Sequence, residues 1–241
     1  MRATKIAVLA ALLSVAPAIA QDPVTVNPHM VKVEFENEQI RVLRVHYTPQ
    51  ERFPMHSHPG YVVILVMGRV RMPDGTMQYR PVNDPGGGAI WSDKVTHESE
   101  IYEAPAETIE IEIKRATVPA VEVRPNGEVP AANILKEPVP VELEPHHHVF
   151  FQNQYVRVLD VFFPVGEPAL FHTHSNDNVS IELSGDKTKS QAMGGEWSAP
   201  GDVVHGRVAF HKAHGQPYTH RVGSAGEKPF HVIDVEIFPD R

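Results

Sequence analysis

The segment VEFENEQIRVLRV at residues 33–45 recurs as VFFQNQYVRVLDV at residues 149–161, at a constant offset of 116. The same offset carries His56 and His58 onto His172 and His174, so that ten of the 26 positions from 33 to 58 are identical. Average composition would give about one or two identities. Further along, IEIEI at 109–113 resembles IDVEI at 233–237. We infer that the chain contains the same domain twice.

The residues that surround these two segments set the domain boundaries. We expect an N-terminal domain at 21–114 and a C-terminal domain at 146–241. Between them, residues 115–145 carry prolines at 119, 125, 130, 138, 140 and 145. Proline at this density excludes a continuous helix or central strand and favours an extended linker. Within it, residues 131–135 are expected to allow one helical turn.

The first 20 residues have the pattern of an export signal. Arg2 and Lys5 precede an apolar run at 6–15, and the small residues Ala18 and Ala20 form a cleavage site. The apolar run is too short to span a bilayer. The sequence therefore predicts a signal peptide at 1–20, cleaved after Ala20, and a periplasmic or secreted product that does not stay in a membrane.

The hydrophobic periodicity inside both copies is two rather than 3.6. Apolar and acidic residues alternate at 109–113 and 233–237, as in strands with one buried face, and residues 62–66 form a short β-branched run. Turn signals separate these runs, and amphipathic helices of ordinary length are not evident. We predict an all-β fold of two tandem antiparallel jelly-roll barrels joined by the Pro-rich linker.

Composition narrows the classes of function. The 241 residues hold 22 basic and 30 acidic side chains, a net charge of −8, and no cysteine. The acidic balance argues against nucleic acid as a partner. Without cysteine the chain has no disulfide, thiolate metal site or cysteine nucleophile. The expected partner is a small-molecule ligand or substrate, and homodimerisation is left open.

Two histidine pairs at strand spacing are the strongest chemical signal. Residues i and i+2 of a strand project from one face, so His56 and His58 point the same way, as do His172 and His174. A later Thr-His pair in each copy offers a third imidazole, from His97 or His220. Three converging imidazoles with open positions suit a divalent metal. The sequence thus predicts two metal sites.

These motifs resemble those of the cupin superfamily, and the duplication resembles a bicupin. The family's first motif is G-x5-H-x-H-x3–4-E-x6-G. The C-terminal copy keeps its spacing from Gly166 through His172 and His174 to Gly185, with Asn178 in place of Glu. The N-terminal copy is one residue shorter, and Tyr61 or Val62 stands at that position. The resemblance implies metal sites built from histidine; without the family Glu, they are either three-His sites or sites that have lost metal. Whether Asn178 is a ligand stays open.

Strand alternation predicts different interiors for the two barrels. If Asn178 faces inward, so do Ser180 and Glu182, and the C-terminal interior is polar. Tyr61 facing inward would bring Val63 and further apolar residues with it, so we expect an apolar interior around the N-terminal histidines. Glu182 is then a candidate catalytic acid, base or extra ligand; the alternative is that this strand has the opposite register.

The third C-terminal ligand has two candidates. His205 lies in a P-G-x3-H sequence that mimics the family's second motif, whereas repeat symmetry favours His220. If His220 is the ligand, His205 and two further histidines are expected in a loop insertion absent from the first copy, and the three consecutive histidines before residue 149 in a solvated linker run. The remaining single histidines are assigned to packing. The residues outside the six proposed ligands are, in chain order, His29, His46, His146, His147, His148, His205, His211, His214 and His231.

Two functional hypotheses from different classes follow. The first is a metal-dependent enzyme, a dioxygenase or isomerase acting on a small molecule, with a divalent ion (Fe, Mn, Zn or Ni) as cofactor. The second is a non-catalytic cupin that binds a sugar or metabolite, which absence of the family Glu favours; a storage role is a weaker third. Metal content of the purified protein separates the first two.

Overall fold

The structure is a computed structural model that describes residues 21–71, 77–79, 88–98, 104–125 and 135–240. The expected signal peptide and all but the last residue of the expected helical turn at 131–135 lie outside these ranges. Within them the chain is almost entirely β, which confirms the predicted fold class. Its elements are α1 (Pro23–Val26), β1 (Val31–Glu36), β2 (Ile40–Tyr47), β3 (His56–His58), β4 (Tyr61–Met67), β5 (Arg69–Arg71), β6 (Met77–Tyr79), β7 (Ala89–Ser92), β8 (Val95–His97), β9 (Ala106–Ile113), β10 (Val139–Pro140), the 3-10 turn η2 (Val141–Leu143), β11 (His147–Gln152), β12 (Val156–Phe163), β13 (His172–His174), β14 (Asp177–Ser184), β15 (Lys187–Ala192), β16 (Gly201–Asp202), β17 (Val208–His211), β18 (Tyr218–Ser224) and β19 (Phe230–Ile237).

The order of strands in the main sheet is the same in both halves. The N-terminal half has a five-stranded sheet in the order β1-β2-β9-β4-β7, and the C-terminal half has β11-β12-β19-β14-β17. Opposite each lies a second layer, β3-β8 and β5-β6 in the first half and β10-β13-β18-β15-β16 in the second. Non-consecutive neighbours joined by antiparallel pairing are the mark of a jelly roll. The structure therefore shows two jelly-roll barrels in tandem.

The repeated asparagine explains part of the sequence identity between the halves. In the β1–β2 turn, Asn37 Oδ1 accepts hydrogen bonds from the main-chain N–H groups of Gln39 and Ile40, both at 2.9 Å. In the β11–β12 turn, Asn153 Oδ1 accepts from Tyr155 and Val156 at 2.8 and 3.0 Å. A short side chain that bonds its own backbone two and three residues on closes such turns. Each hairpin is held in register at its turn by the same contact.

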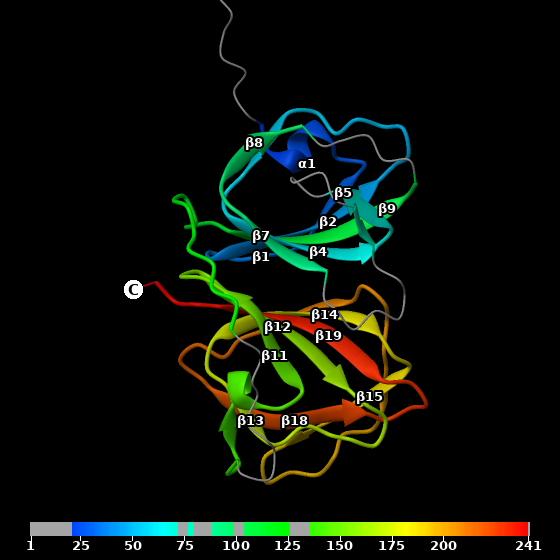
Figure 1. Ribbon diagram of the computed structural model, residues 1–241, viewed down its shortest axis with the longest axis vertical. Helices are drawn as coiled ribbons and strands as arrows, with labels where there is room; N and C mark the ends of the chain where they lie inside the picture. Colours follow the sequence, from blue (N-terminus) through cyan, green and yellow to red (C-terminus); the bar gives the residue numbers. More distant parts are fainter. Residues whose placement is uncertain (1–20, 72–76, 80–87, 99–103, 126–134, 241) are drawn as a thin grey trace, which may run out of the picture.

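The largest apolar core lies between the two barrels rather than inside either one. One cluster of buried residues combines side chains of β2, β4 and β9 with side chains of β12, β14 and β19. Figure 1 shows these two sheets facing each other across the middle of the molecule. Since each strand alternates, the apolar face of each main sheet is turned to the other barrel, and its second face is turned to the barrel interior.

Polar contacts cross the same interface. Arg44 Nη2 donates to the main-chain oxygen of Gly206 at 2.5 Å, and Phe35 stacks on Phe210 with ring centroids 4.5 Å apart. Gly206 has φ +76°, and a Cβ there would lie 3.1 Å from Arg44 Nη1. A side chain at residue 206 would therefore face both backbone strain and a close contact.

Part of the expected linker belongs to the C-terminal barrel. β10 pairs in parallel with β13, and Val141 lies in the apolar cluster of that barrel. Earlier in the segment, the main chain of Val123 pairs with that of Gln152. The C-terminal unit thus begins upstream of residue 146, whereas the start of the linker also contacts the N-terminal barrel, since the Gly60 N–H donates to the Ala116 main-chain oxygen at 2.7 Å.

Replacing Ile233 by alanine tests the role of the inter-barrel core. Ile233 is fully buried in that cluster, and removing a buried isoleucine side chain to Cβ costs about 2–5 kcal/mol. We expect the free energy of unfolding in urea to fall by that amount, with both barrels unfolding in one transition. Val121→Ala is the control, because Val121 is 74% exposed and surface changes stay within about 0.5 kcal/mol. Two separate transitions in the wild type would contradict a shared core.

Candidate metal centres

Short strand pairs set the six predicted histidines in two groups. β3 pairs with β8 so that His56 lies opposite His97, and β13 pairs with β18 so that His172 lies opposite His220. The i, i+2 pair then presents its second imidazole on the same face. The register is identical in the two halves, which shows His220 to be the counterpart of His97.

In the N-terminal barrel the three imidazoles converge. One ring nitrogen from each of His56, His58 and His97 lies within 4.8 Å of the others. The Nδ1–H of His56 donates to the main-chain oxygen of Pro54 at 2.7 Å, which leaves Nε2 with its lone pair. His97 Nε2 is buried without a hydrogen-bond partner in the described structure. Such orphaned nitrogen atoms are costly unless a ligand accepts their lone pairs.

His58 is held by a carboxylate and an arginine. Its Nδ1 lies 2.7 Å from Glu112 Oε1, and Arg41 Nε donates to Glu112 Oε2 at 2.6 Å. Burial works to raise the pKa of Glu112, but hydrogen bonds from His58 and Arg41 prevail and lower it. An ionised carboxylate on Nδ1 fixes the imidazole tautomer and leaves Nε2 to bind a metal.

A second carboxylate lies on the other side of His58. Glu110 Oε2 is 3.9 Å from His58 Nε2, and Glu110 is 5% exposed. Burial raises the pKa of Glu110. Glu110 and Glu112 of β9 therefore face the barrel interior, and the expectation of one buried face is wrong, since both faces are buried. The expected apolar surroundings of these histidines are also wrong at His58, although Leu43, Phe53 and other apolar side chains fill the same barrel.

Neither barrel places a carboxylate where the cupin motif has its Glu. Tyr61 lies opposite Glu112 and Asn178 opposite Glu236, so Tyr61 rather than Val62 is the counterpart of Asn178. Tyr61 stacks on His58 with ring centroids 4.5 Å apart. The buried carboxylates come instead from the neighbouring strands β9 and β19.

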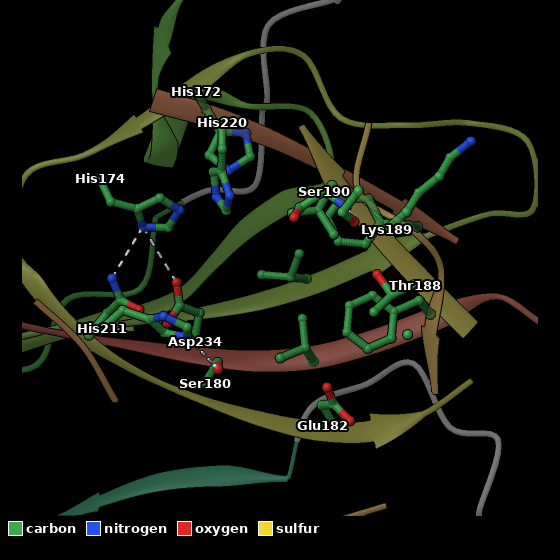
Figure 2. A pocket seen from close by; sticks show the side chains of 18 of the residues that line it. His172, His174, Ser180, Glu182, Thr188, Lys189, Ser190, His211, His220 and Asp234 are labelled. Atoms are coloured by element: carbon green, nitrogen blue, oxygen red, sulfur yellow. Dashed lines mark hydrogen bonds and ion pairs between the residues drawn. The ribbon is translucent and has the colours of Figure 1, made fainter. Parts of the chain in front are cut away.

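In the C-terminal barrel His172, His174 and His220 surround one point (Figure 2). Their ring centroids are 4.7 Å apart for His172–His220, 5.2 Å for His174–His220 and 5.1 Å for His172–His174. The Nδ1–H of His172 donates to the main-chain oxygen of Leu170 at 2.9 Å. Nε2 of His172 and Nε2 of His220 are buried without a partner among the described residues. The donor set fits a divalent metal.

A fourth imidazole, which the sequence analysis missed, lies beside these three. His147 was expected in a solvated run, but it is 4% exposed at the start of β11, and its ring centroid is 4.4 Å from that of His172. That expectation was wrong because residues 147–152 form β11, the edge strand of the main sheet, rather than linker. The repeat gave no signal here, since Val31 occupies the corresponding position.

His174 contacts polar groups of β14 and β19. Its Nδ1 lies 3.5 Å from Asn178 Nδ2 and 3.6 Å from Asp234 Oδ2. A dashed line in Figure 2 marks the contact with Asp234. Tyr218 stacks on the imidazole with centroids 4.9 Å apart. Burial, and then the charge of Glu236, raises the pKa of Asp234 well above its usual range. Asp234 is thus a buried carboxyl group beside His174.

Burial and mutual repulsion favour the neutral form of His97, His172 and His220. The pKa of His172 is lowered to about 2, first by burial and then by His147 and His220. Burial, together with the neighbouring imidazoles, lowers the pKa of His220 to about 4 and that of His97 to about 4. Metal ligation needs the unprotonated ring. Both centres are therefore ready to bind a cation at neutral pH.

A cavity of about 520 Å³ opens from the C-terminal histidines. Its walls combine apolar side chains with hydroxyl groups on β14, on β15 and in the segment between β15 and β16, and a volume of this size suits a small organic molecule. The apolar residues are Val161, Phe163, Val222, Phe230 and Val232, and the hydroxyl groups belong to Ser180, Thr188, Ser190 and Ser198.

Glu182 lines the cavity together with Asn178 and Ser180, as the alternation predicts. Its carboxylate is bound on both oxygens, however: Oε2 accepts from the Val204 main-chain N–H at 2.7 Å, and Oε1 pairs with Arg207. In Figure 2 it lies apart from the histidines. These contacts make Glu182 a support for the 203–207 loop, and we do not assign it the catalytic role that the sequence suggested.

His205 and His211 both lie outside the two metal centres, but His211 lines the cavity. His205 lies between the barrels, its ring nitrogens 2.6 Å from the oxygen of Leu183 and 3.1 Å from that of Val66. His211 was expected in an insertion, but it lies on β17, which pairs with β14 as β7 pairs with β4. Its Nε2 is 3.1 Å from Ser180 Oγ at the rim of the cavity.

The sequence assigned three single histidines to packing, and the structure places two of them at exposed positions instead. His231 is buried, with Nε2 2.5 Å from Asp160 Oδ1. His29 and His46 have exposed side chains and lie beside Glu51 and Glu107. Packing therefore describes His231 alone.

Exchanging Glu112 for glutamine tests the support of the N-terminal centre. The substitution keeps the shape of the side chain but removes the charge that fixes His58. Loss of such a partner lowers metal affinity about 10–100-fold, so we expect that drop for one of two bound Co²⁺ ions in equilibrium dialysis. Glu98→Gln, at an exposed pair with Arg52, is the matched control. Unchanged affinity would show that Glu112 does not orient a ligand.

Among the described residues, the helical segments are too short or too polar to cross a bilayer. No protein-family model matches the sequence, and the curated proteins yield no match. Solved structures do match. AerE from Microcystis aeruginosa is 11% identical, with a TM-score of 0.56 over 91% of this chain and 98% of that one.

A cupin 2 conserved barrel domain protein from Leptotrichia buccalis is 12% identical, with a TM-score of 0.50 over 86% of this chain and 88% of that one. A variant of Bacillus subtilis oxalate decarboxylase is 12% identical over 83% of this chain and 69% of that one, at a TM-score of 0.49. At such identities the likeness concerns the fold. Together with the duplicated strand order, the two structures with TM-scores of 0.56 and 0.50 show that this chain has a cupin-like fold with two barrels in tandem.

Proposed function

We propose that the protein is a metal-dependent enzyme that acts on a small molecule in its C-terminal barrel. One observation carries the proposal: the buried, unpartnered Nε2 atoms of His172 and His220 lie beside His174 at the wall of a cavity of about 520 Å³. A binding site for metal and a space for an organic molecule are thus adjacent. When bound, a first-row divalent ion supplies Lewis acidity and, in the case of iron, redox chemistry with dioxygen.

The residues of this barrel can position and enclose a substrate. Val161, Val232 and Phe230 form an apolar wall that excludes water, and hydroxyl groups of Ser180 and Ser190 offer hydrogen bonds to polar substituents. Burial raises the pKa of Asp234 and so favours its protonated form, which can donate a proton close to His174. Dioxygenase or isomerase chemistry is consistent with these parts.

We propose a structural role for the metal of the N-terminal centre. Phe53 packs on His56 with centroids 4.2 Å apart, whereas the corresponding residue of the second copy is Ala169. Phe53 also belongs to an apolar cluster with Leu43 and Val45 inside the N-terminal barrel. An ion held there would link β3 to β8 and stabilise the barrel.

A second candidate function is binding without chemistry. Asn178 and Tyr61 in place of the family Glu favour it, because a ligand site needs the cavity but not a complete metal centre. A metal-free protein that binds a metabolite would support this alternative.

Elemental analysis followed by an activity screen tests the proposal. The chain expressed from residue 21 onward is purified without a polyhistidine tag, and its metals are measured by mass spectrometry. We expect stoichiometric first-row metal, and oxygen consumption or product formation with members of a small-molecule panel that disappears after chelation and returns with metal. Metal-free protein that cannot be loaded would exclude the proposal.

We also propose that the protein is exported. The support is the basic, apolar and small-residue pattern of residues 1–20. Expression of the full chain in a Gram-negative host, followed by N-terminal analysis of the periplasmic fraction, should give a chain that begins at Gln21. Retention of the full chain in the cytoplasm would contradict export.

A further inference from the structure

His147 occupies a position in the C-terminal barrel that the N-terminal barrel fills with an apolar side chain. It lies at the start of β11 and lines the cavity. One ring nitrogen from each of His147, His172 and His174 lies within 4.8 Å of the others. The corresponding residue of the first copy, Val31, is buried in an apolar cluster. Of the two copies, only the C-terminal one thus has an imidazole at this position.

A buried carboxylate fixes the orientation of His147. Glu144 is fully buried, and its Oε2 lies 2.6 Å from His147 Nδ1. The main-chain N–H groups of His146 and Leu170 also donate to Glu144, at 2.7 and 3.0 Å. With the Nδ1 proton donated to this carboxylate, His147 Nε2 keeps its lone pair. The Nε2 atom, on the other side of the ring from this carboxylate, is then left to act as a ligand.

The same loop orients a second imidazole. Leu170 donates its N–H to Glu144 and accepts the Nδ1 proton of His172 on its carbonyl oxygen. The two rings, 4.4 Å apart between centroids, are therefore set by one hydrogen-bonded unit. In the first copy the position of Glu144 is occupied by Pro28, so this unit is absent there. A preorganised pair of imidazoles is what a metal site requires of its supporting residues.

We propose that His147 is a fourth imidazole ligand of the C-terminal centre, which makes the two metal sites of this chain chemically different. The inference rests on the proposed metal site. The C-terminal centre then offers four neutral nitrogen ligands from His147, His172, His174 and His220. The N-terminal centre offers three, with Glu110 Oε2 3.9 Å from His58 Nε2. Imidazole suits iron, nickel, copper and zinc, whereas carboxylates suit manganese and magnesium. The C-terminal centre should discriminate more strongly against Mn²⁺.

Replacement of His147 by valine installs the residue of the first copy. The test uses metal-free chain from residue 21 onward, titrated with Co²⁺ and followed by equilibrium dialysis and by the visible d–d bands. For the wild type we expect two bound ions. For His147→Val we expect one of them to bind at least about 10-fold more weakly, with a changed spectrum. His148→Val is the matched control, because His148 is the exposed neighbour, and it should titrate as the wild type does.

Two further variants keep the test decisive if valine disturbs folding. His147→Gln retains a polar side chain but no imidazole, and Glu144→Gln retains the imidazole but not its charged partner. Both should weaken the same ion, and circular dichroism of the metal-free proteins checks their fold. If folded His147 variants bind both ions with wild-type affinity and spectrum, His147 is not a ligand, although the metal sites stand. If the wild type itself binds no Co²⁺, the proposed function is overturned as well.

Discussion

The double variant His172→Ala, His174→Ala is expected to lose about one metal ion per chain and all turnover. The two side chains are almost fully buried at one point, and no other imidazole of β13 can replace them. Elemental mass spectrometry measures the bound metal, and the activity screen measures turnover with any substrate found. The expected loss is the largest of any substitution, because it removes the ion and the adjacent substrate position together.

Two control variants show whether the loss is specific to the C-terminal histidines. His214→Ala changes an exposed loop histidine and should keep both metal and turnover. The reciprocal variant His56→Ala, His58→Ala should lose the other ion and retain turnover, with a lower melting temperature. If turnover is lost with the N-terminal ligands and kept without the C-terminal ones, the assignment of the two barrels is reversed.

Metal-free protein is expected to be markedly less stable at about pH 5 than at neutral pH. Histidine has an ordinary pKa of 6.5, and in the folded chain the pKa is lowered to about 2 for His172 and to about 4 for His220 and His97, chiefly by burial. The unfolded chain therefore takes up protons first as the pH falls through 6.5, which favours unfolding. Each such histidine contributes about 2 kcal/mol of lost stability by about pH 5.

Comparison of single variants isolates this effect. Burial raises the pKa of Glu110 and of Asp234, so these groups act in the opposite direction. Urea unfolding at the two pH values should show a smaller loss for His172→Gln than for the wild type. His148→Gln, at an exposed position, should leave the loss unchanged. Equal pH dependence in all three proteins would show that His172 is not buried in neutral form.

Sequence patterns were sufficient to predict features that depend on spacing along a single strand or between the two copies. The two-residue period of the strands placed Asn178, Ser180 and Glu182 on the cavity side, and repeat symmetry selected His220 over His205. Both follow from the alternation of side chains along a strand and from the equal spacing of two copies of one fold. These predictions needed no knowledge of which strands become neighbours.

Predictions that depended on distant contacts went wrong. The acidic positions of 109–113 appeared solvent-facing, but Glu110 and Glu112 turn inward, because the apolar face of β9 packs against the other barrel. Glu182 appeared available for catalysis, but Arg207 and the main chain of Val204 bind its carboxylate. In a strand the pattern gives two faces; which face is covered, and by what, depends on partners far away in the chain.

The amino-acid sequence by itself determined the duplication, the all-β barrels and the pairing of six histidines, because periodicity and repeat spacing are properties of the chain alone. The tertiary structure decided that the barrels share one apolar core and that His147 lies beside His172. It also decided that carboxylates of β9 and β19 lie on the strands beside the two positions at which the cupin Glu is missing. These outcomes depend on packing between segments that are far apart in the chain. Packing replaces the water around a side chain by protein atoms, and the spacing of residues along the chain does not show which atoms these will be.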